Sequence, residues 1–287
     1  MNTLNYHHLR YFREVALQGN LSRTAKRLRI SQSALSIQIR TLEESLGHAL
    51  FERVGRTLVL TEVGTITLDH ANRIFGAGEE LLNTLQRNGS SLPPLRVGAL
   101  STLSRNFQMS FLRPAIEGQK VELILKSGNT GTLLKALQSL ELDVVLTTEV
   151  PQRDDGAEFA AQRISEQPVG LHGMMQFLDR PTLKDLLENE PLIVPTESAI
   201  RTGFESLVAR LEITPRVLAS VDDMAMVRLL ARTGAGLAVA PAVALADEIA
   251  SGHLSTAPFD LNISEPFYAV TIPRKFPHPS LADLLAG

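Results

Sequence analysis

The stretch Ser31–Gly47, SQSALSIQIRTLEESLG, decides how the first part of the chain folds. Its apolar residues recur at intervals of four, three and four, which predicts one buried stripe of an amphipathic helix. These residues are Leu35, Ile39, Leu42 and Leu46. Ser31 occupies an N-cap position and Gly47 the position of a left-handed stop, so we expect the helix to lie between them.

The opposite face of this helix lacks the Glu and Lys residues that usually make a surface helix soluble. It carries instead Gln32, Ser33, Ser36, Ile37 and Arg40. Small hydroxyls and an amide near a helix N-terminus can reach base edges in a major groove, and the exposed N–H groups favour phosphate. Taken alone, this pattern is more typical of an ordinary solvated helix than of a DNA-reading one.

The neighbouring segments favour DNA binding. Helices are expected over 4–17 and 21–28, and a tight turn then leads into the Ser31 helix, which makes a helix-turn-helix. Residues 49–60 alternate around a basic tip that contains Arg53 and Arg56. This pattern predicts a β-hairpin wing over phosphates, although a charged hairpin turn is the plainer alternative. Residues 61–89 form a long linker helix whose apolar stripe indicates dimerisation, and 90–94 form a hinge.

Charge separates the first 60 residues from the rest of the chain. They carry nine Lys and Arg against four Glu, a net charge of +5, whereas the whole chain has −3. A basic head on an acidic body indicates that only the head meets a polyanion. Cysteine is absent, and we find no secretory signal and no membrane span. We therefore expect a cytoplasmic protein.

From residue 95 onward, β-prone runs alternate with helical patterns, which predicts a parallel, doubly wound sheet. The expected strands are 95–100, 121–126, 143–148, 169–172, 192–194, 217–221, 237–240 and 267–272, and the expected helices 104–117, 131–140, 200–211 and 222–232. The last strand crosses back to the first part, so we predict two lobes with a cleft between them. Lobe I covers about 95–160 and 265–287, and lobe II about 161–264. The fold class is thus α + α/β, with the winged helix-turn-helix over 1–60.

The head, from LRYFREV at Leu9 to LTEVG at Gly64, resembles the N-terminal domain of the LysR-type transcriptional regulators. The remainder resembles the family's effector-binding domain, of periplasmic-binding-protein fold, through the segment Gly234–Pro241. Within the family, 5–9, 69–75 and 265–269 resemble the subgroup that activates sodium/proton antiporters. The resemblance implies a homodimer, or a tetramer as a dimer of dimers, with RNA polymerase as a further partner.

The resemblance also implies DNA contacts at particular residues. Gln32, Ser33 and Ser36 correspond to family positions that contact bases, and Arg53 and Arg56 to positions that contact phosphates or the minor groove. Many members carry a basic residue where this chain has Ile37. That side chain can meet a thymine methyl but cannot pair with guanine or phosphate, so relatives do not supply the operator sequence.

Ligands of doubly wound folds bind at the carboxyl ends of strands, facing helix N-termini. Hydroxyl, amide and carboxyl residues lie at four such places, although each also fits an ordinary N-cap or turn. They are Ser101, Thr102 and Ser104, then Ser127, Asn129 and Thr130, then Thr147 and Thr148, and finally Thr196, Glu197 and Ser198. Together they favour an anionic or polar ligand, whereas Glu197 favours a cation, a donor group or a metal ion. The sequence shows no calcium-like cage of carboxylates, so it does not support a cation effector. His172 is expected to be a core histidine.

Three classes of function remain to be compared. The leading hypothesis is a sequence-specific transcriptional regulator controlled by a small ligand between the lobes. A solute-binding protein would need a signal peptide and would not need the basic head. An enzyme is disfavoured because Gly234 and Gly236 lack the rest of a dinucleotide fingerprint, and no GxSxG, Walker A or metal-spaced set is present. We expect no cofactor and no metal site, and the sequence does not identify the effector, which could be a small molecule or an ion.

Overall fold

The chain divides into two compact units, which are described separately. The computed structural model describes residues 4–54, 57–85, 92–118, 121–152, 159–196 and 199–286. The N-terminal unit is formed by Met1–Asn88 with Ser139–Glu141, and the C-terminal unit by the rest of the chain. Among the described residues, no helix combines the length and the hydropathy that crossing a bilayer requires.

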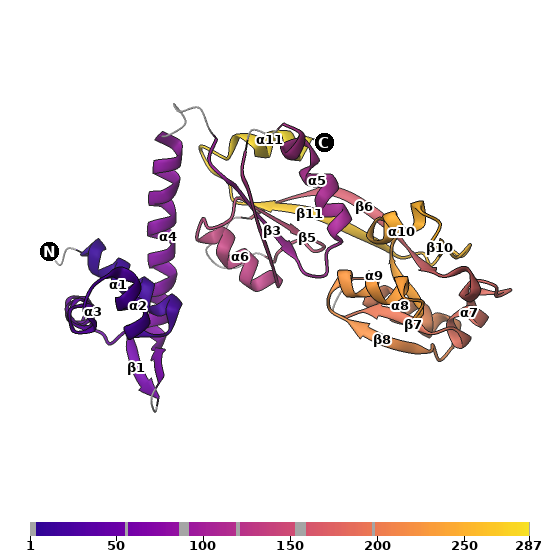
Figure 1. Ribbon diagram of the computed structural model, residues 1–287, viewed down its shortest axis with the longest axis horizontal. Helices are drawn as coiled ribbons and strands as arrows, with labels where there is room; N and C mark the ends of the chain where they lie inside the picture. The colour runs from indigo at the N-terminus through magenta and orange to yellow at the C-terminus, as the bar shows by residue number, and fades with distance from the viewer. Residues whose placement is uncertain are drawn as a thin grey trace. The chain divides into compact units, whose positions relative to one another are not determined.

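The N-terminal unit is a three-helix head followed by a hairpin and a long helix (Figure 1). Its elements are α1 (Tyr6–Gln18), α2 (Leu21–Leu28), α3 (Gln32–Leu46), β1 (Phe51–Val54), β2 (Thr57–Leu60) and α4 (Glu62–Leu85). The two strands pair antiparallel, with Phe51 opposite Leu60. The predicted helix-turn-helix and hairpin are therefore confirmed as elements.

The ends of α2 and α3 are fixed by the residues that the sequence indicates. Ser31 Oγ accepts a hydrogen bond from the N–H of Ala34 at 3.1 Å, and Gly47 has φ of 74°. Asn20 caps α2 in the same way, its Oδ1 accepting from the N–H of Arg23 at 2.9 Å. Each such cap stabilises its helix by about 1 kcal/mol. Both predictions for α3 are confirmed.

The head buries one face of each helix in two adjoining clusters. Leu35 and Ile39 of α3 pack with Val15 of α1, while Leu42 packs with Phe12, which is fully buried. Helix α4 adds apolar side chains to the same core, among them Val63, Ile74 and Phe75. Because this core takes up the apolar stripe of α3, the polar edge of that helix is left to solvent.

The C-terminal unit is built on one nine-stranded sheet. Its strands are β3 (Leu95–Leu100), β4 (Leu123–Gly128), β5 (Val144–Thr147), β6 (Ala160–Gly173), β7 (Leu192–Pro195), β8 (Val217–Val221), β9 (Leu237–Pro241), β10 (Ser255–Thr256) and β11 (Ser264–Thr271). Its helices are α5 (Arg105–Glu117), α6 (Thr130–Gln138), η2 (Met175–Phe177), α7 (Leu183–Asn189), α8 (Ala199–Leu211), α9 (Met224–Arg232), η3 (Ala242–Leu245), α10 (Ala246–Ala250) and α11 (Pro279–Ala286).

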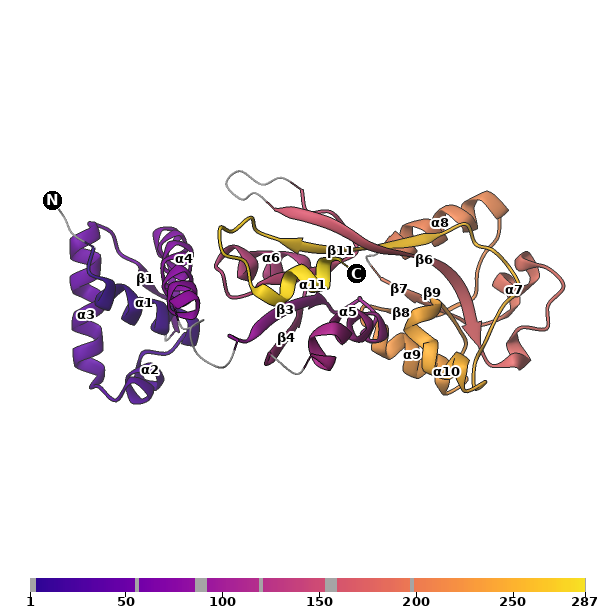
Figure 2. The ribbon, with the colours of Figure 1, turned by 90° about the horizontal axis from the view of Figure 1, so that it is seen from above.

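The sheet is mixed, so the prediction of a wholly parallel sheet is wrong. The strand order is β4-β3-β5-β11-β6-β9-β7-β8, with β10 on β6. β11 lies antiparallel to both β5 and β6, and β6 lies antiparallel to β9. Two long crossing strands, β6 and β11, run side by side through the whole unit (Figures 1 and 2). The sequence predicted only residues 169–172 of the 14-residue strand β6, because its first four residues, Ala160–Arg163, are exposed and show no apolar alternation.

The crossing strands turn the carboxyl ends of two parallel strand sets toward each other. β3, β4 and β5 are parallel, as are β7, β8 and β9, and the pairings through β11 and β6 give the two sets opposite directions. The end of β5 lies level with Arg163 of β6, and the end of β9 pairs with Val169. The ends of β5 and β9 are therefore separated by six residues of β6, which is roughly 20 Å at 3.3 Å per residue.

Each strand set has its own apolar core. One core gathers buried residues of β3, β5 and β11 with α5, and the other gathers β7 and β9 with α8 and α9. Asp143, at the start of β5, is buried and accepts from Arg96 Nη2 at 3.0 Å and from Arg274 Nη1 at 3.1 Å. This ion-pair cluster ties the segment that follows β11 to the first strand set.

Candidate functional site

The predicted DNA-reading edge of α3 is exposed along its length. Gln32, Ser33, Ser36, Ile37 and Arg40 all lie in solvent, and Ile37 keeps 61% of its surface exposed although it is a large apolar residue. The apolar face of the same helix is buried in the head. The structure thus places all five residues on one free edge.

Two hydrogen bonds order the beginning of this edge. Ser22, on α2, donates its hydroxyl to Gln32 Oε1 at 2.9 Å, and the hydroxyls of Ser31 and Ser33 lie 3.0 Å apart. The bond from Ser22 restrains the amide of Gln32 and leaves its NH₂ group, two donors, for an outside acceptor. Ser22 was not predicted from sequence, because its partner is ten residues away and meets it only through the turn between the helices.

The wing presents a cation and an apolar residue at the end of β1. Arg53 is exposed, and among the described residues no ion pair engages its guanidinium. The neighbouring Val54 is 62% exposed. Arg56 lies outside the described residues, so its predicted role stays a prediction. A free guanidinium on a hairpin beside the helix-turn-helix has the chemistry of a phosphate contact.

The predicted effector residues lie where the two strand sets end, and several already have partners. Ser104 caps α5 through the N–H of Phe107, and Asn129 caps α6 through the N–H of Thr132. Ser127 Oγ accepts from Arg105 Nη1 at 2.8 Å. The alternative interpretation, an ordinary N-cap, therefore holds for Ser104 and Asn129, although a cap hydroxyl can also donate to a ligand.

The remaining predicted hydroxyls differ in burial. Thr147 is buried and bonds the backbone of Glu149, whereas Thr148 is equally buried and makes no side-chain hydrogen bond to another described residue. Ser101, Thr102 and Thr196 are half-buried, and Thr130 is exposed. Glu197 and Ser198 lie outside the described residues.

A buried carboxyl that sequence reasoning missed lies on crossing strand β11. Glu265 is 1% exposed, and burial raises its pKa to about 8. His172, by contrast, is the core histidine expected: its ring nitrogens lie 2.9 Å from Thr256 Oγ1 and 3.0 Å from the carbonyl oxygen of Ala240. Burial lowers the pKa of His172, against the opposing effect of the bond to Ala240. An alternating strand pattern would have drawn attention to Glu265 as a polar residue on an apolar face.

Two family models together match nearly all of the chain. The model of the bacterial regulatory helix-turn-helix proteins of the lysR family matches residues 6–65, and that of the LysR substrate binding domain matches residues 88–286. The chain belongs to the LysR family. It is a LysR-type, DNA-binding transcriptional regulator with a substrate-binding domain, as the resemblance of its head implied.

Named transcriptional regulators match nearly the full length of the chain. The transcriptional activator protein NhaR of Escherichia coli is 25% identical over 98% of this chain and 94% of its own. The regulator PcaQ of Agrobacterium fabrum is 27% identical over 97% of this chain and 91% of its own.

Solved structures of the family share the fold. Full-length CbnR complexed with its target DNA has a TM-score of 0.71 at 21% identity, covering 98% of both chains. A full-length OxyR from Pseudomonas aeruginosa has a TM-score of 0.68 at 23% identity, over 99% of this chain and 94% of its own. At these identities the likeness establishes the fold alone.

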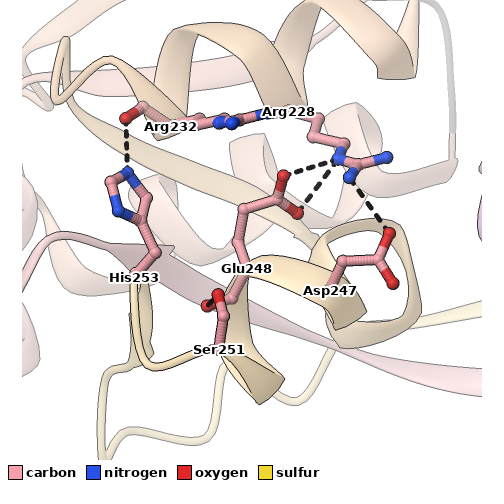
Figure 3. Close-up of a pocket in the computed structure, with 6 residues that line it drawn as sticks. All are labelled: Arg228, Arg232, Asp247, Glu248, Ser251 and His253. Carbon is pink, nitrogen blue, oxygen red and sulfur yellow. Dashed lines mark hydrogen bonds and ion pairs between the residues drawn. The ribbon is translucent and has the colours of Figure 1, made fainter.

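Two pockets are found in the C-terminal unit of this LysR-type regulator. One of about 280 Å³ lies over α9 and α10 (Figure 3). Arg228 bridges Glu248 and Asp247 there, and His253 bonds the carbonyl of Arg232 (Figure 3). Because the carboxylates are satisfied within the protein, this network fastens α10 to α9.

The second pocket, of about 570 Å³, is lined by α6, including Thr130 and Lys135, and by the segment after β5. It contains one residue of the predicted effector set. Within the described ranges, no three His, Asp or Glu side chains come together as metal ligands.

Proposed function

We propose that this regulator reads its operator with the exposed edge of α3 and contacts the flanking phosphates of the DNA with the wing. The observation that carries the proposal is the division of α3 into a fully packed apolar face and a free edge of Gln32, Ser33, Ser36, Ile37 and Arg40. A helix whose only task was to close the head would expose Glu and Lys there. Short polar side chains at the helix start instead fit the major groove.

The chemistry of each side chain suggests its role. Gln32 offers its NH₂ group to acceptors such as guanine O6 or thymine O4, because Ser22 occupies its oxygen. Ser33 and Ser36 serve as short donors or acceptors, Ile37 contacts a thymine methyl, and Arg40 lies one turn further along. Arg53, with Arg56, contacts phosphates or the minor groove without reading sequence directly.

Two copies of the head are needed to place α3 edges in successive grooves, and α4 supplies a surface for pairing. Its last turns expose Leu81, Leu82 and Leu85, at 58%, 59% and 65%. Three large apolar side chains on one short stretch of helix are unfavourable in water and suit a second α4. Half-sites would then lie one helical turn, or a multiple of it, apart.

A second apolar surface supports the tetramer. The sheet of the C-terminal unit ends in two open strands, β4 with Ile124 and Leu125, and β8 with Val217 and Leu218, all at least 39% exposed. Exposed edge strands invite pairing with another chain. Two separate surfaces, one on each unit, allow the two kinds of contact that a dimer of dimers requires.

We place the effector between the strand ends that face each other across β6 and β11. Ser101, Thr102, Thr148 and Thr196 line those ends as hydroxyl donors and acceptors. A ligand that binds one arrangement of the strand sets more tightly than another would shift the population of DNA-binding states.

The proposed role in transcription predicts the cellular location and the further partner of the protein. A DNA operator places the regulator in the cytoplasm, and RNA polymerase is the expected further partner in transcription. We propose that the regulator acts by binding alone, without catalysis and without a cofactor.

Selection of binding sites from a random duplex library by the full chain tests this proposal. A recovered consensus with two spaced half-sites is expected. Q32A and S33A should relax preference at particular base positions and leave the others unchanged. A chain that recovers no consensus, or variants that lose affinity equally for every sequence, would refute base readout by α3. R210A, which removes an exposed cation of α8, is the matched control.

A further inference from the structure

Glu265 combines deep burial with the absence of a partner. Its side chain lies on crossing strand β11 and is 1% exposed. No hydrogen bond or ion pair joins its carboxyl group to any other residue that the structure describes. Buried carboxyl groups are otherwise paired or hydrogen-bonded, because their desolvation is costly. A buried carboxyl group without a hydrogen-bond or ion-pair partner is therefore unusual.

The neighbours of Glu265 along the strand show on which face of the sheet its side chain lies. Ile263, Glu265 and Phe267 alternate with more exposed residues, so the three share one face. Ile263 lies against α8, where a Cβ on Gly203 would come within 2.8 Å of it. The ring of Phe267 lies 4.0 Å from that of Phe107 on α5. Glu265 thus lies between Ile263, which packs against α8, and Phe267, which packs against α5.

The cross-strand neighbours of Glu265 are polar but uncharged. Gln167 of β6 is its register partner, and the amide of Gln167 donates to Ser165 Oγ at 3.0 Å. On the other side of β11, the register with β5 ends with Thr147 opposite Tyr268, and the next residue, Thr148, is buried. The register partner of Glu265 is therefore a neutral amide.

The charged residues of the adjoining helices are bound to other groups. Arg105, in the first turn of α5, donates to Ser127 and to Gln108. Arg201, in the first turn of α8, donates to Glu205 Oε1 and to Ser220 Oγ. On β6, Glu166 alternates to the opposite face, where it pairs with Arg163. Among the described residues, then, none of these cations neutralises Glu265.

We propose that Glu265 is the anchor for a small organic cation, a protonated primary amine, and that such an amine is the effector. The inference rests on the proposed function, in which the effector binds between the facing strand ends. The ammonium group would pair with the carboxylate of Glu265 and donate its other protons to neighbouring oxygens such as that of the Gln167 amide.

The chemistry of the face argues against the other two ligand classes. A carboxylate ligand would meet an acid here and no free guanidinium or ammonium among the described residues. A metal ion such as calcium needs six or more oxygen ligands, several of them carboxylates, and no group of three acidic or histidine side chains gathers in the described part of the chain. A single carboxylate with surrounding neutral oxygens suits an ammonium group, which has three donors.

Proton linkage gives this proposal a quantitative signature. With a pKa of about 8, Glu265 is about 9% ionised at pH 7.0 and about 76% ionised at pH 8.5. An alkyl ammonium group keeps its proton over this range. Because only the ionised site pairs with the amine, the apparent Kd should fall about eightfold between these pH values.

The experiment compares size-matched amines and carboxylates on the full chain. Putrescine, cadaverine, lysine and ornithine form one set, and succinate, glutarate and adipate the other. Thermal shift at pH 8.5 identifies binders, and isothermal titration at pH 7.0 and 8.5 gives their Kd. We expect at least one amine to bind, about eightfold more tightly at pH 8.5, and its Kd to rise tenfold or more in E265Q. E122Q, which removes an exposed carboxylate of the same unit, should bind as the wild type does.

The opposite results overturn the inference. Stabilisation by carboxylates alone, no stabilisation by any amine, an affinity for the amine that is independent of pH, or an E265Q variant that binds it unchanged would each do so. Failure of the proposed function is recognised separately, because site selection from random duplexes uses the unliganded chain. If selection recovers a consensus and no amine binds, only this inference fails.

Discussion

The buried acid Glu265 makes the stability of the regulator depend on pH in a direction opposite to that of most carboxylates. Its folded-state pKa of about 8 lies above the ordinary value of 4.5. A raised pKa means that the folded state holds a proton that the unfolded state has lost. The contribution of this group is therefore fully present below pH 4.5 and is lost as pH rises through 8.

The magnitude follows from the two pKa values. Each unit of difference in pKa corresponds to about 1.4 kcal/mol. Integrating the linkage for this one group gives a loss of about 4 kcal/mol in the free energy of unfolding between pH 5 and pH 9. Because Glu265 is 1% exposed, solvent screening does not reduce this value. E265Q keeps the shape of the side chain and removes the titration.

The assay is urea unfolding of the full chain at pH 5, 7 and 9, followed by far-ultraviolet circular dichroism. The free energy of unfolding of the wild type should fall by about 4 kcal/mol more than that of E265Q across this range. E122Q controls for the loss of one carboxylate from the surface. Parallel curves for wild type and E265Q would show that Glu265 is solvated or paired in the folded protein, and would refute the reasoning.

Four further outcomes are expected. R53A should weaken binding to every duplex and flatten the log–log salt dependence by about 0.9 for each bound head, so an unchanged slope in a salt titration excludes a phosphate contact. S22A should reduce base discrimination at the position read by Gln32, and the double variant with Q32A should be no worse than Q32A alone in a binding-site titration. Because burial lowers the pKa of His172, its contribution to stability is present above pH 6.5 and declines as the pH falls through the lowered pKa; H172Q should show a flatter acid limb in urea unfolding. L81E should shift light scattering toward smaller assemblies, and an unchanged mass would remove α4 from the interface.

The head shows how far local sequence determines this protein. The helix periodicity, Ser31 as a cap and Gly47 as a stop act within a few residues of one another, so the sequence alone predicted α2, α3 and the polar edge of α3. The separation of a basic head from an acidic body is likewise a property of the chain. These features led to the DNA-binding assignment before any contact was known.

Tertiary structure decided what depends on residues far apart in the chain. The exposed first four residues of β6 form a strand only because β11, a hundred residues later, pairs with them, and that pairing makes the sheet mixed. Ser22 reaches Gln32 only through the folded turn. Glu265 looks like any acidic residue before a proline until the fold buries it between Ile263, which packs against α8, and Phe267, which packs against α5. Burial and pairing depend on the positions of distant segments, which the local alternation of side chains does not encode.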